Sequence, residues 1–214
     1  GNAKKVYGDS SKGLDNIDLR RADAFMRGVI YRVLTSFKSK KVLVHCNDWM
    51  TGLIPAAASD RGIRSLMTFH NIFTYHQTPK VLYEQGIDVE PFWKKLFFRE
   101  FPEDFGSYEE NYENNEVDFM ISGLKAADFI NTVSPTFLKE VVENYFFEHK
   151  IIPQNMHNII QKRYYQGSAA GILNAPSIKA DSRKDPLIPV NFGLRPTGDC
   201  VSIFEGKRRN KMLF

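Results

Sequence analysis

The sequence predicts an α/β fold, a Rossmann-like parallel sheet with flanking helices. Short apolar segments at residues 41–46, 65–69 and 128–133 are typical of strands buried in parallel sheets. Helical patterns lie between these segments, and short turns join the first of them. A strand–helix–strand rhythm of this kind indicates parallel strands joined by crossover helices.

The composition is that of an ordinary globular domain and excludes several classes of protein. The chain has 214 residues, of which 43% are hydrophobic and 25% charged. Its net charge of +4 is spread without a basic stripe, so we expect no nucleic-acid partner. No apolar run approaches the roughly 20 residues that span a bilayer, so we expect no membrane partner. Only Cys46 and Cys200 are present, which favours a reducing compartment and a cytoplasmic location.

The first predicted helix begins at Asp15 or Asn16, either of which can cap it. Its apolar residues recur at spacings of three and four, as on one face of a helix. They are Ala22, Phe25, Met26, Val29, Ile30, Val33, Leu34 and Phe37. A turn at 48–52 and an alanine-rich helix at 53–61 then lead from the first strand to the second.

Residues 75–119 break this rhythm. Residues 91–98 are rich in aromatic side chains, and residues 100–118 contain eight acids but no Lys or Arg. We interpret the segment as a long insertion with little regular structure. Its aromatic residues Trp93 and Phe97 either pack under the loop or present a surface to sugars or a partner protein.

The rhythm resumes after the insertion. A helix is expected to end near residue 127, and Ser134 is placed to cap the next helix, with Pro135 at its first position. A further helix is predicted over residues 156–165 and a last short strand over 171–174. Prolines then indicate an irregular C-terminal run that ends in a solvated helix.

Five polar residues lie near the predicted strand ends, where α/β sheets bind ligands. They are His45, Asp48, His70, Asn71 and His76. A metal site is one interpretation, but the spacing of the histidines does not support it. A thiol hydrolase that uses Cys46 is a second, and a pocket whose Asp and Asn side chains bind sugar hydroxyls is a third. For each residue alone, a structural hydrogen bond remains the common alternative.

The chain has neither a P-loop nor a Gly-x-Gly-x-x-Gly sequence, so no self-contained nucleotide site is visible.

Four ordered motifs resemble a known family. HCNDWMTGL at 45–53, TFHNI at 68–72, TVSPTF at 132–137 and GILN at 171–174 are similar to the N-terminal lobe of bacterial glycogen synthases and plant starch synthases. FMISGLKAAD at 119–128 also resembles the family's segment before its Val-Ser-Pro motif. The resemblance implies part of one lobe of a GT-B architecture, in a retaining glucosyltransferase. For a plant or alga it also implies a plastid location.

The resemblance assigns a partial site. Asp48 and His70 match catalytic positions, and Asn71, Asn174 and Tyr7 match substrate-binding positions. The implied partners are a nucleotide-sugar donor, ADP-glucose or UDP-glucose, and an α-1,4-glucan whose non-reducing end accepts glucose. No cofactor and no metal are implied.

Several departures from the family qualify this assignment. Asn47 replaces the second His of the His-x-His-Asp-Trp pattern, and Lys12-Gly13-Leu14 only partly matches the Lys-x-Gly-Gly-Leu donor loop. The second lobe, which carries the phosphate ligands, has no counterpart in the 214 residues. We therefore expect residues 1–190 to be a partial catalytic lobe, residues 191–214 a tail or linker helix, and the chain alone to be an inactive hexosyltransferase fragment.

Two further expectations follow. The alternative function is a catalytically inert glucan-binding or partner-binding module derived from that lobe. The strand at 41–46 is expected at an exposed sheet edge. Through this edge the chain is expected to self-associate or swap a segment, unless its own tail from Pro186 onward covers it.

Overall fold

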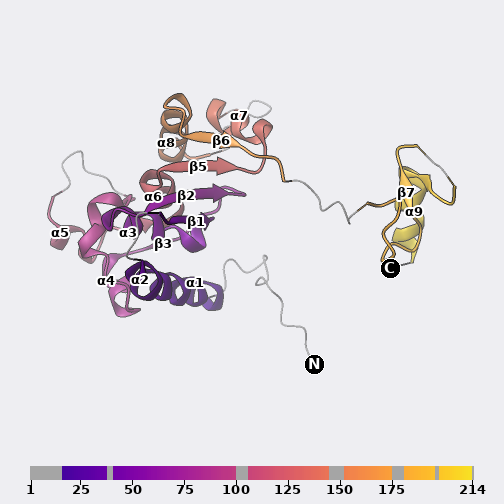
Figure 1. Cartoon of the computed structure of the whole chain (residues 1–214). Coiled ribbons are helices and arrows are strands. Elements are labelled where there is room, and N and C mark those ends of the chain that lie inside the picture. Colours follow the sequence, from indigo (N-terminus) through magenta and orange to yellow (C-terminus); the bar gives the residue numbers. More distant parts are fainter. Residues whose placement is uncertain are drawn as a thin grey trace. The chain divides into compact units, whose positions relative to one another are not determined.

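The computed structural model describes residues 16–37, 41–99, 106–144, 152–174, 181–195 and 198–213 (Figure 1). Its contacts divide the chain into two compact units, Gly1–Leu173 and Asn174–Phe214, which we describe separately. The division reports compactness alone. The boundary at residue 190 between a family lobe and a tail stays a prediction.

The first unit is built on a four-stranded parallel sheet, as the sequence predicts. Its strands are β1 (Leu43–Asn47), β2 (Arg64–Phe69), β5 (Phe129–Thr132) and β6 (Ala169–Gly171), in the order β1-β2-β5-β6. The last strand lies earlier than predicted, because Ala169 and Ala170 pair with β5 whereas the apolar Ile172 and Leu173 that suggested a strand are mostly exposed.

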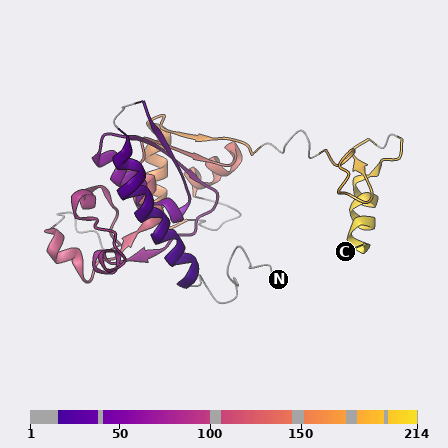
Figure 2. The same ribbon diagram turned by 60° about the horizontal axis from the view of Figure 1, so that its bottom comes forward.

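Helices connect these strands. Before β1 stand α1 (Asn16–Gly28), the π-helical turn η2 (Val29–Val33) and α2 (Leu34–Ser36), and Figure 2 shows α1 in front of the sheet. After β1 come a 3-10 turn, η3 (Trp49–Thr51), and α3 (Ile54–Asp60). The later helices are α6 (Phe119–Ala126), α7 (Pro135–Glu143) and α8 (Gln154–Tyr165). Ser134 caps α7 as predicted, since its side chain accepts the Phe137 N–H at 3.0 Å.

The predicted apolar face of the first helix is partly wrong. Met26, Ile30 and Leu34, four residues apart, are fully buried. The neighbouring stripe is exposed instead, with Phe25 at 56%, Val33 at 43% and Phe37 at 40%. Apolar residues at spacings of three and four form two adjacent stripes on a helix. The first stripe is buried in the core, whereas the second contacts it only through the partly buried Val29.

The sheet has one covered and one open face. Cys46, Met67 and Ile130 point from three strands into the single hydrophobic core, and α6 packs so closely there that a Cβ on Gly123 would lie 2.9 Å from Met67. Side chains at the intervening positions, Leu66 and Phe129, are only partly buried and lie outside that core. Parallel sheets are ordinarily covered on both faces. We call the second side the open face.

The insertion at 75–119 has more regular structure than expected. Its described elements are β3 (His76–Gln77), α4 (Pro79–Glu84), the 3-10 helix η4 (Glu90–Lys95), α5 (Tyr108–Tyr112) and β4 (Val117–Asp118). These pieces are too short to show a period in the sequence, and local capping defines them. Ser107, for example, forms a capping box with Glu110.

The aromatic residues of the insertion pack inside it. Trp93 and Phe97 are partly buried against the hydrophobic core, and the Trp93 ring lies 6.2 Å from that of Phe98 and 6.0 Å from that of Tyr108. Of the two alternatives for these side chains, the structure supports packing under the loop.

The second unit is small. It contains β7 (Phe192–Gly193), β8 (Val201–Ser202) and α9 (Ile203–Met212). Asn210 fixes α9, since it accepts the Val190 N–H at 3.0 Å and donates to the Val190 carbonyl at 2.8 Å. The helix also carries Arg208 and Arg209 paired with Glu205, in agreement with the predicted solvated helix.

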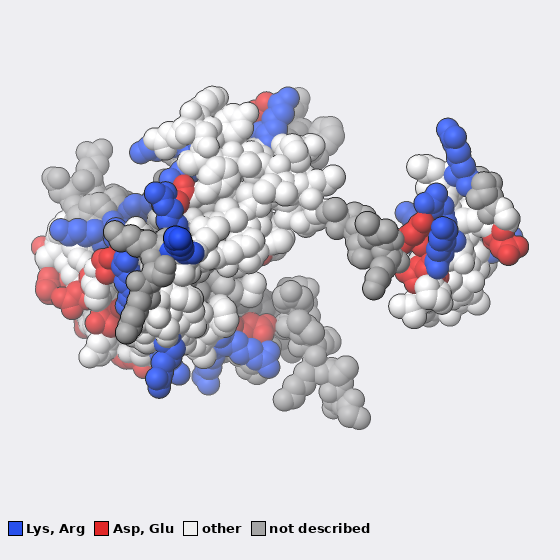
Figure 3. Space-filling model, in the orientation of Figure 1, with Lys and Arg blue, Asp and Glu red and all other residues white. Residues whose placement is uncertain are grey.

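The charged side chains, the cysteines and the helices of the described residues can be compared with what the composition predicts. Figure 3 shows Lys and Arg dispersed over the first unit and acidic side chains gathered around α5. Both cysteines are free and buried. Within the described ranges, no helix has the length and apolar character needed to cross a bilayer.

The buried carboxylate of Asp23 is expected to make the stability of the fold depend on pH. Its side chain is only 2% exposed, and Gln77 donates to one carboxylate oxygen at 3.3 Å while the other finds no partner among the described residues. Burial raises the pKa of Asp23 to about 6. Because this pKa lies above its value in the unfolded chain, the native state binds the extra proton and is favoured at low pH. Stability is therefore lost as pH rises from about 4 to 6.

We expect Asp23→Asn to be more stable than wild type at pH 7.5, by at most about 3 kcal/mol, and to lack this loss of stability. Urea unfolding between pH 4 and 8 measures it, with the exposed Asp60→Asn as the matched control. Equal pH dependence in Asp23→Asn and wild type would contradict the assignment.

Candidate functional site

Asp48 stands directly after β1 in a strained conformation. Its backbone has φ 55° and ψ −176°, a region that is almost restricted to glycine. The side chain is only 8% exposed. A non-glycine residue held in such a conformation requires compensating interactions, and these are found around its carboxylate.

The Asp48 carboxylate joins the ends of the first two strands. Its Oδ1 accepts the backbone N–H of His70 at 2.7 Å, and the Asp48 N–H donates to the Thr68 carbonyl at 2.9 Å. His70 follows β2 as Asp48 follows β1, so this pair of bonds fixes one strand end against the other. No described residue donates to Asp48 Oδ2.

The turn after Asp48 is held by Thr51 and Gly52. Thr51 Oγ1 accepts the Asn47 N–H at 2.7 Å and donates back to the Asn47 carbonyl at 2.9 Å. A Cβ on Gly52 would lie 2.0 Å from the carbonyl oxygen of Phe119, so only glycine lets this turn pack on the start of α6. The turn therefore presents Asp48 from a fixed support.

His70 and Asn71 present polar groups beside Asp48. The exposed His70 ring has its Nε2 3.2 Å from Asn47 Oδ1, and because that oxygen can only accept, Nε2 donates. Asn71 Oδ1 accepts the Phe73 N–H at 2.9 Å, which turns the chain after β2. Asn47, the position at which the sequence departs from the His-x-His-Asp-Trp pattern, is thus in contact with His70.

A second polar group crosses the open face. His45 Nε2 lies 2.6 Å from Thr68 Oγ1, which donates to Asn131 Oδ1 at 2.5 Å. Because the Thr68 hydroxyl donates its only proton to Asn131, it must accept from His45. Thr68 and Asn131 are buried, at 5% and 7% exposure, although they lie on the open face.

The roles of Thr51, Thr68 and Asn131 are not predicted by the motifs of the sequence. Thr68 and Asn131 could have been found as polar residues within otherwise apolar strands, since they face each other on the adjacent strands β2 and β5. Thr51 gives no comparable signal, since threonine is common in turns.

The structure brings together only some of the predicted residues. Asp48, His70 and Asn71 share the carboxyl ends of β1 and β2. His76 is instead paired with Asp118 at 2.9 Å, where β3 and β4 pair antiparallel. Asn174 is exposed and is the first residue of the second unit, so its place in the site stays a prediction. Tyr7 lies outside the described residues, and its role also stays a prediction.

Two of the alternative chemistries find no support in this geometry. Cys46 is only 1% exposed, and burial raises the pKa of its thiol to about 12, which disfavours the thiolate that a nucleophile requires. Among the described residues no three His, Cys, Asp or Glu side chains gather as metal ligands do. Asp48, His70 and Asn71 form a wall of hydrogen-bonding groups at the carboxyl ends of β1 and β2, where α/β sheets bind ligands.

The comparisons with known proteins agree with this fold. The family described as the starch synthase catalytic domain matches residues 1–161, and the chain belongs to that family. Among solved structures, the catalytic domain of Starch Synthase IV from Arabidopsis thaliana, bound to ADP and acarbose, is similar with a TM-score of 0.59 and 22% identity. The match covers 93% of this chain and 37% of that one. The predicted family resemblance and fold class are confirmed.

The strained backbone at Asp48 gives a second prediction. We expect Asp48→Ala to lower the free energy of unfolding, because it keeps the strain and removes the acceptor of the His70 N–H. Asp48→Gly also removes the acceptor but relieves the strain, so it should be about 1–3 kcal/mol more stable than Asp48→Ala. Urea denaturation measures both, and equal stability of the two variants would show that the backbone is unstrained.

Proposed function

We propose that the first unit forms one wall of a hexosyl-transfer site. The reaction moves glucose from ADP-glucose or UDP-glucose to the non-reducing end of an α-1,4-glucan, with retention at the anomeric carbon. The observation that carries the proposal is the Asp48–His70 link at the carboxyl ends of adjacent parallel strands, in a chain of the starch synthase family.

The contacts of Asp48 and His70 support a role for each of these two residues. Asp48 positions His70 through Oδ1, and its Oδ2 is left for a sugar hydroxyl. The His70 ring, oriented by Asn47, supplies a hydrogen bond near the reacting sugar. Asn71, Asn174 and Tyr7 bind substrate in this proposal. Hydrogen bonds of this kind act through orientation and through charge stabilisation as the diphosphate leaves.

The wall is one part of the site. The chain spans about a third of the Arabidopsis chain that it matches, 37%, so the phosphate contacts belong to a second lobe in this proposal. We expect the isolated chain to give no transfer above a boiled control.

A chimera tests the proposed function. In it, the matched segment of the Arabidopsis enzyme is replaced by this chain, and transfer from radiolabelled ADP-glucose or UDP-glucose to glycogen is measured. We expect incorporation with at least one nucleotide sugar, and a loss of about 10²-fold or more in His70→Ala, since an oriented hydrogen bond to the reacting sugar contributes about that much. Tyr83→Ala, an exposed residue of α4, is the control. A folded chimera without transfer, or full activity in His70→Ala, contradicts the proposal.

We also propose that copies of the chain associate with one another through the edge of β1 that does not face β2. Among the described residues β1 pairs with β2 alone, and its first residue, Leu43, is 61% exposed. Phe37, which is 40% exposed, adds apolar surface shortly before that strand. Exposed strand edges of this kind recruit further strands.

We expect the chain to form dimers or larger species in light scattering coupled to size exclusion. A version ending at Asp185 should associate equally, because β1 belongs to the first unit. The double variant Phe37→Lys/Leu43→Lys should be monomeric, since charge blunts an edge. Monomeric wild type at every concentration, in both lengths, contradicts the proposal.

A further inference from the structure

A groove separate from the Asp48–His70 wall lies between α7, α8 and β6. Its volume is about 540 Å³, within the range of small-ligand sites. The strand order places β5 between β6 and β2, so this groove is at the far side of the sheet from β1. It is lined by Pro135, Leu138, Lys139, Val142, Glu143, Tyr164, Tyr165 and Gly171.

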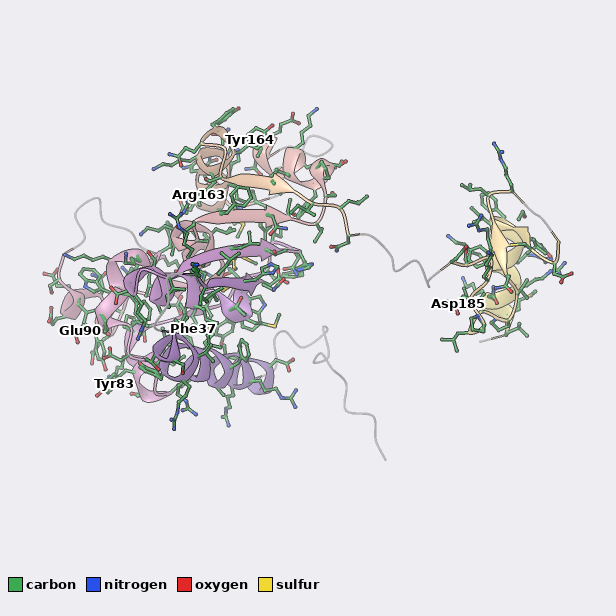
Figure 4. All side chains as sticks on the ribbon, viewed as in Figure 1. Phe37, Tyr83, Glu90, Arg163, Tyr164 and Asp185 are labelled. Atoms are coloured by element: carbon green, nitrogen blue, oxygen red, sulfur yellow. The ribbon has the colours of Figure 1, made fainter. Side chains whose placement is uncertain are left out.

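Tyr164 and Tyr165 form an aromatic wall of this groove, which we call the tyrosine groove. The rings of Tyr164 and Tyr165 lie 5.5 Å apart at 73°, and the side chains are 45% and 75% exposed. Figure 4 shows Tyr164 directed outward from the end of α8. A tyrosine combines an apolar ring face with a polar hydroxyl, so an exposed pair presents both kinds of contact to a ligand.

The rest of the groove consists of buried aliphatic side chains at its base, the floor, and two exposed charged side chains at its rim. Leu138 and Val142 are 5% and 6% exposed, so the aliphatic floor is largely covered already. Lys139 and Glu143 stand on the same helix with their charged groups 3.8 Å apart and their side chains 75% and 55% exposed. The rim therefore offers both donors and acceptors to a ligand in the groove.

The tyrosines stand on a fixed support. Arg163 donates to the backbone carbonyls of Lys125 and Ala127 at 2.6 and 2.5 Å, which ties the end of α8 to the end of α6. The chain then leaves the helix through Gly167, which has φ 70°. A Cβ on Gly171 would lie 2.4 Å from Pro135, so glycine lets β6 approach α7. The backbone that carries the two tyrosines is thus fixed before a ligand arrives, which lowers the entropic cost of binding.

We propose that the tyrosine groove binds an α-glucan chain apart from the transfer site; the inference rests on the proposed function for its choice of sugar. Apolar faces of the glucosyl rings pack on Tyr164 and Tyr165, and hydroxyls bond to the Lys139–Glu143 rim. A peptide helix fits less well, because it would insert apolar side chains into an open aliphatic groove, and here Leu138 and Val142 are covered. When one part of a long glucan is bound in the groove, its other chain ends remain near the protein. Their effective concentration at the transfer site is therefore high.

The test follows glucan binding by the full chain, without transfer. ¹⁵N-labelled protein is titrated with maltoheptaose, and native gels containing glycogen measure retardation. We expect amide signals of Tyr164, Tyr165 and Lys139 to move on titration. Tyr164→Ala/Tyr165→Ala should weaken binding at least about tenfold with an unchanged circular dichroism spectrum, since both stacking faces are lost. The matched control, Tyr83→Ala on α4, should bind as wild type does.

The outcomes separate this inference from the proposed function. Unmoved groove signals, or full binding by the double variant, overturn the groove as a glucan site whatever the chimera shows. An equal response to cellohexaose overturns the assignment to α-linked chains. Groove binding that persists while the chimera fails to transfer glucose contradicts the proposed function alone, and leaves a glucan-binding module.

Discussion

The candidate site depends on one hydrogen bond, from the backbone N–H of His70 to the carboxylate of Asp48. It joins the ends of two adjacent strands, together with the bond from the Asp48 N–H to the Thr68 carbonyl. To make it, Asp48 takes a backbone conformation that costs about 1–3 kcal/mol. Gly52 makes that geometry possible by allowing the following turn to pack against Phe119. Strain at a site is therefore offset by tight packing behind it.

The sheet sets the wider constraint. Cys46, Met67 and Ile130 bury one face in a continuous core, whereas Leu66 and Phe129 leave the other open, and β1 is paired on one side among the described residues. A parallel sheet is most stable with both faces covered. The edge of β1, with the exposed Leu43, is the surface through which we propose that the chain associates.

The sequence predicted the sheet and its order of elements well, because Val-Leu-Val-like strands and the Ser134-Pro135 cap are local signals. It failed where structure is decided by contacts distant in sequence. The stripe carrying Phe25 had the same period as the buried one, and nothing local tells which face packs. The Asp48–His70 bond joins residues 22 apart, so the resemblance identified both residues but not their link. The tyrosine groove was missed because Tyr164 and Tyr165 are adjacent in a helix and follow no motif.

Amide hydrogen exchange at His70 tests the central claim most directly. The account predicts that this amide, although it lies just beyond the end of β2, exchanges in wild type as slowly as that of Met67 inside the strand. In Asp48→Ala the protection of His70 should be lost while that of Met67 remains. Fast exchange at His70 in wild type, or unchanged protection in Asp48→Ala, would show that the carboxylate does not hold the strand ends together.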